Sequence, residues 1–256
     1  MFLTIIAFWV FILGLVFGSF LNALEWRLHE KKSLMERSEC TKCHKQIKWY
    51  DNVPLVSYIL LKGRCRECKD KISVQYPIVE FVMALLFVFV FYYYSSFATF
   101  SLFSIIRDCL VLFVLTFIFV YDTKHLEVSD AVTLGASLLF FIVSLFFGAN
   151  WFDMTLGALI GAGFFLLQFV ISKGKWVGGG DIRIGLLMGI LLGWKLTILA
   201  LWIAYVVGGI FSIILVLMKK KGMKTEVAFG TYLTVATCIA MFFGMQILDW
   251  YFRLVF

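Results

Sequence analysis

The sequence predicts an all-α protein that crosses a membrane several times, and three observations carry this prediction. Of its 256 residues, 62% are hydrophobic and 15% are charged, whereas soluble domains carry about 25% charged residues. The mean hydropathy is +0.95. Apolar stretches of about 20 residues, the length that a helix needs to cross a bilayer, recur along nearly the whole chain. These features exclude a disordered chain, a disulfide-rich secreted domain and an ordinary soluble enzyme.

We expect a polytopic helix bundle of about eight transmembrane helices. The first five spans are Met1–Leu24, Pro77–Tyr94, Leu102–Tyr121, Ala131–Phe147 and Phe152–Ile171. The next apolar stretch, Ile184–Met218, is too long for one helix, and Gly193-Trp194-Lys195 interrupts it. We therefore divide it into a short sixth span, 182–193, and a seventh, 196–218. Phe229–Leu254 is the eighth span.

Lysine and arginine gather on one side of the predicted membrane. Of the 23 cations, 20 fall on that side, twelve of them in Glu25–Tyr76 and the rest in the connections 122–130, 172–183 and 219–226. Cytoplasmic loops carry such an excess, so an even number of spans places both termini outside the cytoplasm. The first span lacks a basic leader and a cleavage site, so we expect an uncleaved anchor. The charge accounts for orientation, and we expect no nucleic-acid partner.

One polar segment interrupts the hydrophobic pattern. Glu25–Tyr76 holds four of the six cysteines and most of the charge. We therefore expect three parts: a first transmembrane helix at residues 1–24, a small cytoplasmic tetracysteine module at 25–76, and a membrane core at 77–256.

The module contains two Cys-x-x-Cys motifs, Cys40-Thr41-Lys42-Cys43 and Cys65-Arg66-Glu67-Cys68. Each such turn presents two thiolates, and four thiolates hold a tetrahedral Zn²⁺ with no open position for catalysis. We therefore expect a structural zinc ion on Cys40, Cys43, Cys65 and Cys68. Four unliganded thiols, or His44 in place of one cysteine, are the alternatives.

Two aspartates fall at the same predicted membrane face. Asp122 ends the third span, and Asp181 follows three glycines at the start of the sixth. Two carboxyl groups a few ångströms apart cannot both ionise readily, so one takes a proton from water while the neutral one polarises a peptide carbonyl. Consecutive glycines disfavour a helix and permit close approach of another backbone. We expect Gly178, Gly179 and Gly180 to position an extended substrate there.

Other roles fit the same residue types. Asp181 suits the N-cap of the sixth helix, as Asp130 suits that of the fourth. Transport proteins also use intramembrane acids and broken helices. A transporter or channel with a zinc-stabilised loop is therefore the alternative function, and a scaffold that recruits partners through the loop is another. Glu80 lies near the cytoplasmic end of the second span, so we expect it to face the two aspartates. We expect Arg107 to extend toward the membrane surface.

Several motifs occur in a fixed order along the chain. They are Gly18-Ser19-Phe20-Leu21-Asn22 with Arg27-Leu28, Trp49-Tyr50-Asp51-Asn52-Val53-Pro54-Leu55, Gly63-Arg64-Cys65-Arg66, Tyr76-Pro77-Ile78-Val79-Glu80, Gly178-Gly179-Gly180-Asp181 and Phe229-Gly230. This ordered set resembles the bacterial type IV prepilin peptidases, which are membrane aspartyl proteases of the GxGD class. The resemblance covers nearly the whole chain.

The resemblance implies that Asp122 and Asp181 are a catalytic pair in the bacterial cytoplasmic membrane. They would cleave the short basic leader of prepilins or pseudopilins at the cytoplasmic face. It also implies methylation of the new N-terminus with S-adenosylmethionine, because the tetracysteine loop is typical of members with both activities. Ser129 and Ala228 replace prolines of the family pattern and Arg183 replaces a lysine, but no carboxyl group is lost. The expected partners are the substrate and membrane lipid.

Overall fold

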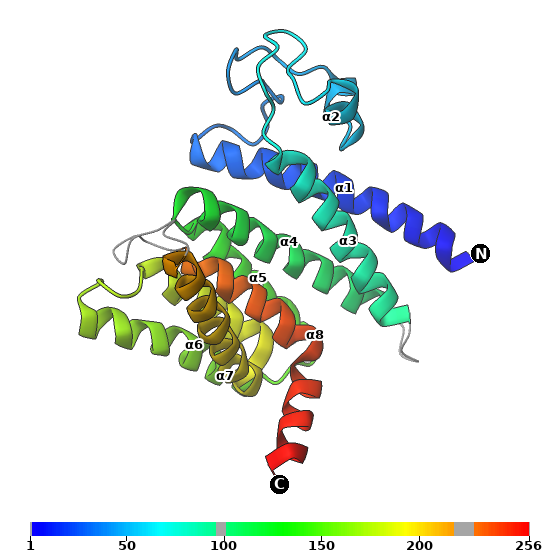
Figure 1. The fold of residues 1–256 in the computed structure, drawn as a ribbon. Helices are drawn as coiled ribbons and strands as arrows, with labels where there is room; N and C mark the ends of the chain where they lie inside the picture. Colours follow the sequence, from blue (N-terminus) through cyan, green and yellow to red (C-terminus); the bar gives the residue numbers. More distant parts are fainter. Residues whose placement is uncertain (1, 96–100, 218–227, 256) are drawn as a thin grey trace. The chain divides into compact units, whose positions relative to one another are not determined.

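The structure, a computed structural model, describes residues 2–95, 101–217 and 228–255. These residues form eight α-helices and one short 3-10 helix, and no β-strand occurs among them. The helices are α1 (Phe2–His29), η1 (Trp49–Asn52), α2 (Val56–Leu60), α3 (Gln75–Ser95), α4 (Leu102–His125), α5 (Asp130–Phe146), α6 (Trp151–Ser172), α7 (Gly179–Leu217) and α8 (Phe229–Val255) (Figure 1).

The predicted all-α membrane bundle is confirmed. Six helices are long and apolar enough to cross a membrane, namely α1, α3, α4, α6, α7 and α8. Helix α5 has 17 residues, which is near the lower limit for a span. Helix α7 consists of two helices that meet at Gly193, where φ is 68° and ψ is 174°. The division predicted at Gly193 is therefore correct. With α5 and both parts of α7 counted, the described residues contain the eight predicted segments.

One part of the charge pattern cannot be compared with the structure. Lys219, Lys220, Lys221 and Lys224, which contribute to the predicted orientation, lie outside the described residues.

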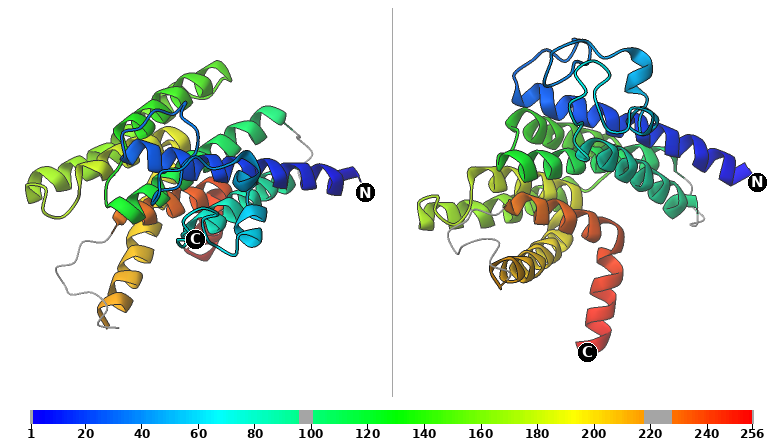
Figure 2. Two further views of the ribbon diagram at one scale, coloured as in Figure 1. Left: turned by 90° about the horizontal axis from the view of Figure 1, so that it is seen from above. Right: turned by 45° about the horizontal axis from the view of Figure 1, so that its top comes forward.

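The chain divides into two compact units, Met1–Phe113 and Val114–Phe256. In the first unit α1 packs against α3 (Figure 2). A Cβ atom at Gly14 would lie 2.5 Å from the Cα atom of Ala84, and one at Gly18 would lie 2.6 Å from that of Glu80. The Gly-x-x-x-Gly spacing on α1 thus lets the two backbones approach closely, as in other membrane helix pairs.

The second unit is built around α7, which packs against α5, α6 and α8. Helices α6 and α7 run antiparallel, and each carries a Gly-x-x-x-Gly pair at the crossing. A Cβ atom at Gly157 would lie 2.5 Å from the carbonyl oxygen of Gly189, and one at Gly185 would lie 2.5 Å from that of Gly161. Larger side chains at these positions would separate α6 from α7, since the backbones are in direct contact.

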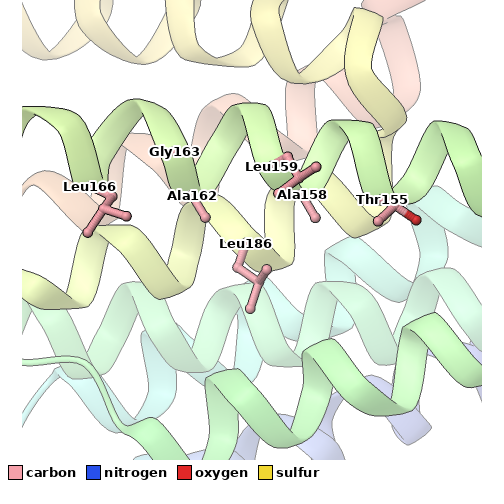
Figure 3. Close-up of a pocket in the computed structure, with 7 residues that line it drawn as sticks. All are labelled: Thr155, Ala158, Leu159, Ala162, Gly163, Leu166 and Leu186. Carbon is pink, nitrogen blue, oxygen red and sulfur yellow. The ribbon is translucent and has the colours of Figure 1, made fainter.

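A shallow groove of about 300 Å³ lies along α6 beside the first part of α7 (Figure 3). Its lining consists of Thr155, Ala158, Leu159, Ala162, Gly163, Leu166 and Leu186. The lining contains no titratable side chain, so this groove is not a site for acid–base chemistry.

Gly193 provides a test of the break in α7. Its positive φ disfavours any L side chain at a cost of about 1–3 kcal/mol, and a Cβ atom there would overlap the carboxylate of Asp153. We expect Gly193→Ala to lower the thermal unfolding temperature of the detergent-solubilised protein. Gly163→Ala is the matched control, because a Cβ atom at Gly163 meets nothing within 4 Å. Equal unfolding temperatures for the two variants would contradict this account of the break.

Candidate active site and tetracysteine site

Asp122 lies one turn before the end of α4 and is buried, with 5% of its surface exposed. Its Oδ2 atom accepts a hydrogen bond of 3.0 Å from the backbone N–H of Thr231, in the first turn of α8. The first N–H groups of a helix have no partner within the helix, and the positive end of the helix dipole attracts an anion. The start of α8 is therefore a suitable partner for this carboxylate.

Gly230 explains why the carboxylate can reach α8. A Cβ atom at Gly230 would lie 2.7 Å from Oδ2 of Asp122 and 2.7 Å from Cδ1 of Ile184. Ile184 is on α7, one turn after Asp181. Only glycine leaves room for both contacts, so the Phe229-Gly230 motif has a steric role at this site.

Asp181 is the third residue of α7 and is also buried, with 8% of its surface exposed. Its Oδ2 atom accepts a hydrogen bond of 3.2 Å from the backbone N–H of Gly178, the residue before the helix. This is the reciprocal half of a capping box, in which the third helical residue reaches back to the N-cap. Asp181 therefore caps the helix from inside it and is not itself the N-cap residue.

The structure brings the two predicted aspartates into one site. The carboxyl group of Asp122 interacts electrostatically with that of Asp181, and Gly230 contacts both the Asp122 carboxylate and α7 next to Asp181. Both groups are largely removed from water within the second unit. Neighbouring buried carboxyl groups hold one proton between them more readily than they carry two charges.

The glycine run before Asp181 does not prevent helix formation, contrary to the expectation from glycine propensity. Helix α7 begins at Gly179. A Cβ atom at Gly180 would lie 2.5 Å from Cγ2 of Val128, whereas one at Gly179 would meet nothing within 4 Å. Packing therefore requires only Gly180 to lack a side chain, and the space beside Gly179 is open.

Two positions beside the aspartates form an ion pair that the sequence pattern did not predict. Arg183 on α7 contacts Asp130 at the start of α5. The N-cap of α5 is Ser129, so the expectation that Asp130 caps this helix is wrong. Both side chains are partly exposed, and such pairs contribute about 0–1 kcal/mol. The pair connects the start of α5 to the first turn of α7.

The sequence pattern also did not predict a second polar pair near Asp181. The Tyr205 hydroxyl donates a hydrogen bond of 2.9 Å to Oε1 of Gln168, and Tyr205 interacts electrostatically with Asp181. The ring of Tyr205 packs edge to face against that of Phe229, with 5.1 Å between centroids. A lone glutamine in an apolar helix was the available signal, because polar residues in membrane helices mark functional or packing sites.

In the first unit, Asp108 has 1% of its surface exposed. It accepts hydrogen bonds from the Tyr94 hydroxyl at 2.6 Å and from Nε of Arg107 at 2.7 Å. Arg107 therefore forms a local ion pair with its neighbour, which accounts for a cation within this span. Glu80 on α3, an acid for which the sequence predicted a position facing the site, accepts a hydrogen bond of 2.8 Å from the backbone N–H of Leu55.

The four cysteines of the module meet at one point. Their Sγ atoms all lie within 4.8 Å of one another, and those of Cys40 and Cys68 are 3.9 Å apart. Zn–S bonds of about 2.3 Å in a tetrahedron place sulfur atoms about 3.8 Å apart, so the cluster fits a metal ion of this kind. His44 contacts Glu39 at 3.3 Å instead, and it is not in the cluster.

The two cysteine motifs fold alike. In each, the backbone N–H of the first cysteine bonds to a carbonyl five residues later, from Cys40 to Lys45 at 3.0 Å and from Cys65 to Asp70 at 2.8 Å. Backbone N–H groups of Cys68 and Glu67 directed at Cys65 lower the pKa of its thiol to about 7. This environment favours the thiolate of Cys65, which is the form that binds a metal. Although the backbone N–H of Asp70 acts against it, burial and the neighbouring Cys65 thiol raise the pKa of Cys68 to about 11.

The Trp49-Tyr50-Asp51-Asn52 motif is hydrogen-bonded to the second cysteine motif. Arg66, between Cys65 and Cys68, forms two hydrogen bonds with Asp51, of 2.7 Å and 2.6 Å. The guanidinium group lowers the pKa of Asp51 below its usual value. The two motifs therefore form one small structure in the module.

Together, the long apolar helices and the two buried acids indicate a polytopic membrane protein with two buried aspartates in its second unit. Residues 12–94 match the family model described as Bacterial Peptidase A24 N-terminal domain, and residues 109–213 match the Type IV leader peptidase family. The chain belongs to the type IV leader peptidase family, as the motifs predicted. No solved structure matches the chain.

Curated relatives support this membership. The chain is 32% identical to the prepilin leader peptidase/N-methyltransferase of Aeromonas salmonicida strain A449, over 94% of this chain and 92% of the relative. It is 31% identical to the protein of the same name from Pseudomonas putida, over 92% of this chain and 90% of the relative. It is 45% identical to the protein of the same name from Myxococcus xanthus over a shorter region, which covers 32% of this chain and 24% of the relative. A transporter or channel is not favoured by these matches.

The position of Gly230 predicts a specific defect. A Cβ atom there would push the Asp122 carboxylate away from the start of α8. We therefore expect Gly230→Ala to lower the activity of this site by at least about tenfold, because displacing a positioned group by about 1 Å lowers the rate by at least that factor. The measurement is cleavage of a prepilin-like substrate by purified protein. Gly209→Ala is the control, since a Cβ atom at Gly209 meets nothing within 4 Å. Full activity of Gly230→Ala would show that this contact is not needed.

Proposed function

We propose that this chain is a membrane aspartyl endopeptidase that removes the leader of prepilins or pseudopilins. The observation that carries the proposal is the buried pair of Asp122 and Asp181. The names of its relatives, prepilin leader peptidase/N-methyltransferase, supply the substrate class. The second activity in those names would add a methyl group to the new N-terminus with S-adenosylmethionine as donor.

The dyad can hydrolyse a peptide bond without a covalent intermediate. One carboxylate takes a proton from a water molecule, and that water attacks the peptide carbonyl while the protonated carboxyl group donates to the carbonyl oxygen. The proton is then passed to the leaving amine as the tetrahedral intermediate collapses. Backbone N–H groups of Thr231 and Gly178 hold the two carboxyl groups in place, so that little reorganisation is needed.

The substrate would reach the dyad from the cytoplasmic side. The excess of lysine and arginine in the 25–76 and 172–183 segments supports a cytoplasmic position for these connections, with both termini outside the cytoplasm. The hydrophobic helix of the substrate would then lie in the bilayer. The peptide ahead of that helix would extend along Gly178–Gly180, where the open space beside Gly179 supports this path.

Removal of either carboxyl group tests the dyad. We expect Asp122→Asn and Asp181→Asn each to lower cleavage of a prepilin-like substrate by at least about 10²-fold, because an amide neither accepts the water's proton nor donates one. Mass spectrometry of the product measures cleavage. Asp249→Asn, at an exposed position near the other end of α8, is the control and should cleave normally. A purified Asp181→Asn protein with normal activity would refute the assignment.

We also propose that Cys40, Cys43, Cys65 and Cys68 hold a structural Zn²⁺. Their sulfur atoms fit four-coordinate zinc, and four protein ligands leave no site for a catalytic water. The residues that link the two cysteine motifs, such as Lys45 and Glu67 at 3.0 Å, would then be positioned by the metal.

Metal analysis of the purified protein tests this proposal. We expect about one zinc ion per chain, and Cys43→Ser should release most of it, because three thiolates bind far more weakly than four. Cys109→Ser, which alters a thiol on α4 outside the cluster, should retain the metal. Zinc content that is unchanged in Cys43→Ser would exclude this site.

A further inference from the structure

Gln168 on α6 carries a hydrogen-bond donor that no described residue accepts. Its Nε2 atom is buried and unpaired, while its Oε1 atom accepts the hydrogen bond from the Tyr205 hydroxyl. The nitrogen has two N–H groups, and turning the amide over would pair only one of them with that hydroxyl. A buried donor without an acceptor is rare in native structures and calls for an explanation.

The crossing of α6 and α7 brings Gln168 toward the start of α7. The two helices are antiparallel, and Gly161 faces Gly185. Gln168 lies about two turns after Gly161, and residues at this spacing share one face of a helix. The same register therefore continues from Gly185 to the glycine run that precedes Asp181. Because a helical side chain leans toward the N-terminus of its own helix, the amide extends back toward the level of Asp181.

Tyr205 connects this amide with both aspartates. Its hydroxyl is the partner of the amide, and the tyrosine also interacts electrostatically with Asp181. Its ring packs against that of Phe229, with 5.1 Å between centroids. The residue after Phe229 is Gly230, which lies against the Asp122 carboxylate. The amide is therefore near the dyad, although neither carboxyl group accepts a hydrogen bond from its nitrogen.

A peptide that is cleaved at this place needs hydrogen-bond donors. Backbone carbonyls that leave a helix at the edge of a membrane find little water, and an unpaired one is costly. The backbone N–H groups of Thr231 and Gly178 already bond to the two carboxyl groups. The space beside Gly179 is open, so an extended substrate can enter there. The side chain of Gln168 has rotatable bonds through which its amide can turn toward that substrate.

We propose that Nε2 of Gln168 donates a hydrogen bond to a backbone carbonyl of the substrate next to the scissile bond, and that the Tyr205 hydroxyl positions the amide for this contact. The inference rests on the proposed peptidase function and deepens it, because it names a group that holds the main chain of the substrate. Every peptide carries such carbonyls, so the contact would serve leaders of different sequence. Gln168 is thus a substrate-binding residue, and Tyr205 is a positioning residue.

Steady-state cleavage of a prepilin-like substrate by the purified full-length protein tests the contact. Gln168→Met nearly keeps the length of the side chain and removes its N–H donors. We expect its KM to rise at least about fivefold, which corresponds to one hydrogen bond. Its kcat should stay near that of the wild type, because the contact forms equally in the bound substrate and in the transition state.

Two further variants accompany this measurement. Tyr205→Phe keeps the ring that packs against Phe229 and removes the hydroxyl that holds the amide, so it should raise KM by a smaller factor than Gln168→Met. Gln246→Met, the same change at an exposed position toward the end of α8, is the matched control and should cleave as the wild type does.

A modified substrate identifies the carbonyl. A thioamide sulfur is a weaker hydrogen-bond acceptor than an amide oxygen, so we would place a single thioamide at each position around the scissile bond in turn. In the wild type, one of these substrates should show a raised KM. The Gln168→Met protein should not distinguish that substrate from the unmodified peptide, since both changes remove the same contact. Additive effects of the two changes at every position would contradict the proposal.

Other outcomes separate this contact from a structural role. A purely structural Gln168 would lower both the unfolding temperature and kcat in Gln168→Met, and a role in the ionisation of Asp181 would move the pH profile of kcat. Either result would overturn the proposal, as would a wild-type KM. If the wild-type protein cleaves no prepilin-like substrate, the proposed function fails and this inference fails with it. If it cleaves and Gln168→Met cleaves with the same KM, only this inference fails.

Discussion

The contact between the Asp122 carboxylate and the start of α8 is the interaction on which the site depends. It joins residues 109 positions apart in the chain and is possible only because Gly230 has no side chain. The unpaired N–H groups of a helix start stabilise a buried carboxylate that hydrocarbon would otherwise disfavour. Asp181 meets a similar backbone donor at the start of α7. Two helix starts thus hold two acids at one place.

Close glycine packing is the constraint that makes this arrangement possible in a membrane. Hydrophobic burial does not drive apolar helices together in lipid, so contact depends on how near the backbones can approach. Gly14 and Gly18 provide this approach in the first unit, and the paired glycines of α6 and α7 provide it in the second. Because α7 carries Asp181 at its start, the α6–α7 crossing helps to set the position of that acid.

The two units carry different groups of polar side chains. The second unit holds the two buried aspartates, Asp122 and Asp181, for which we propose peptide hydrolysis. The first holds a cysteine cluster that fits a metal ion and, between α1 and α3, the buried polar side chains of Asn22 and Glu80. Glu80 connects α3 to the module through the backbone N–H of Leu55. This hydrogen bond joins the module to the helix that follows it in the chain.

The sequence by itself determined the membrane helices, the break at Gly193, the grouping of the four cysteines and the family. These features are local: apolar length, a glycine next to polar residues, the spacing within a Cys-x-x-Cys turn and short ordered motifs. Only the tertiary structure decided which distant groups meet, such as Asp122 with Thr231, Arg183 with Asp130 and Tyr205 with Gln168. In an apolar helix the pattern of residues is too uniform to show which face packs and against what. The partners of its few polar side chains therefore follow from helix packing, which no local pattern encodes.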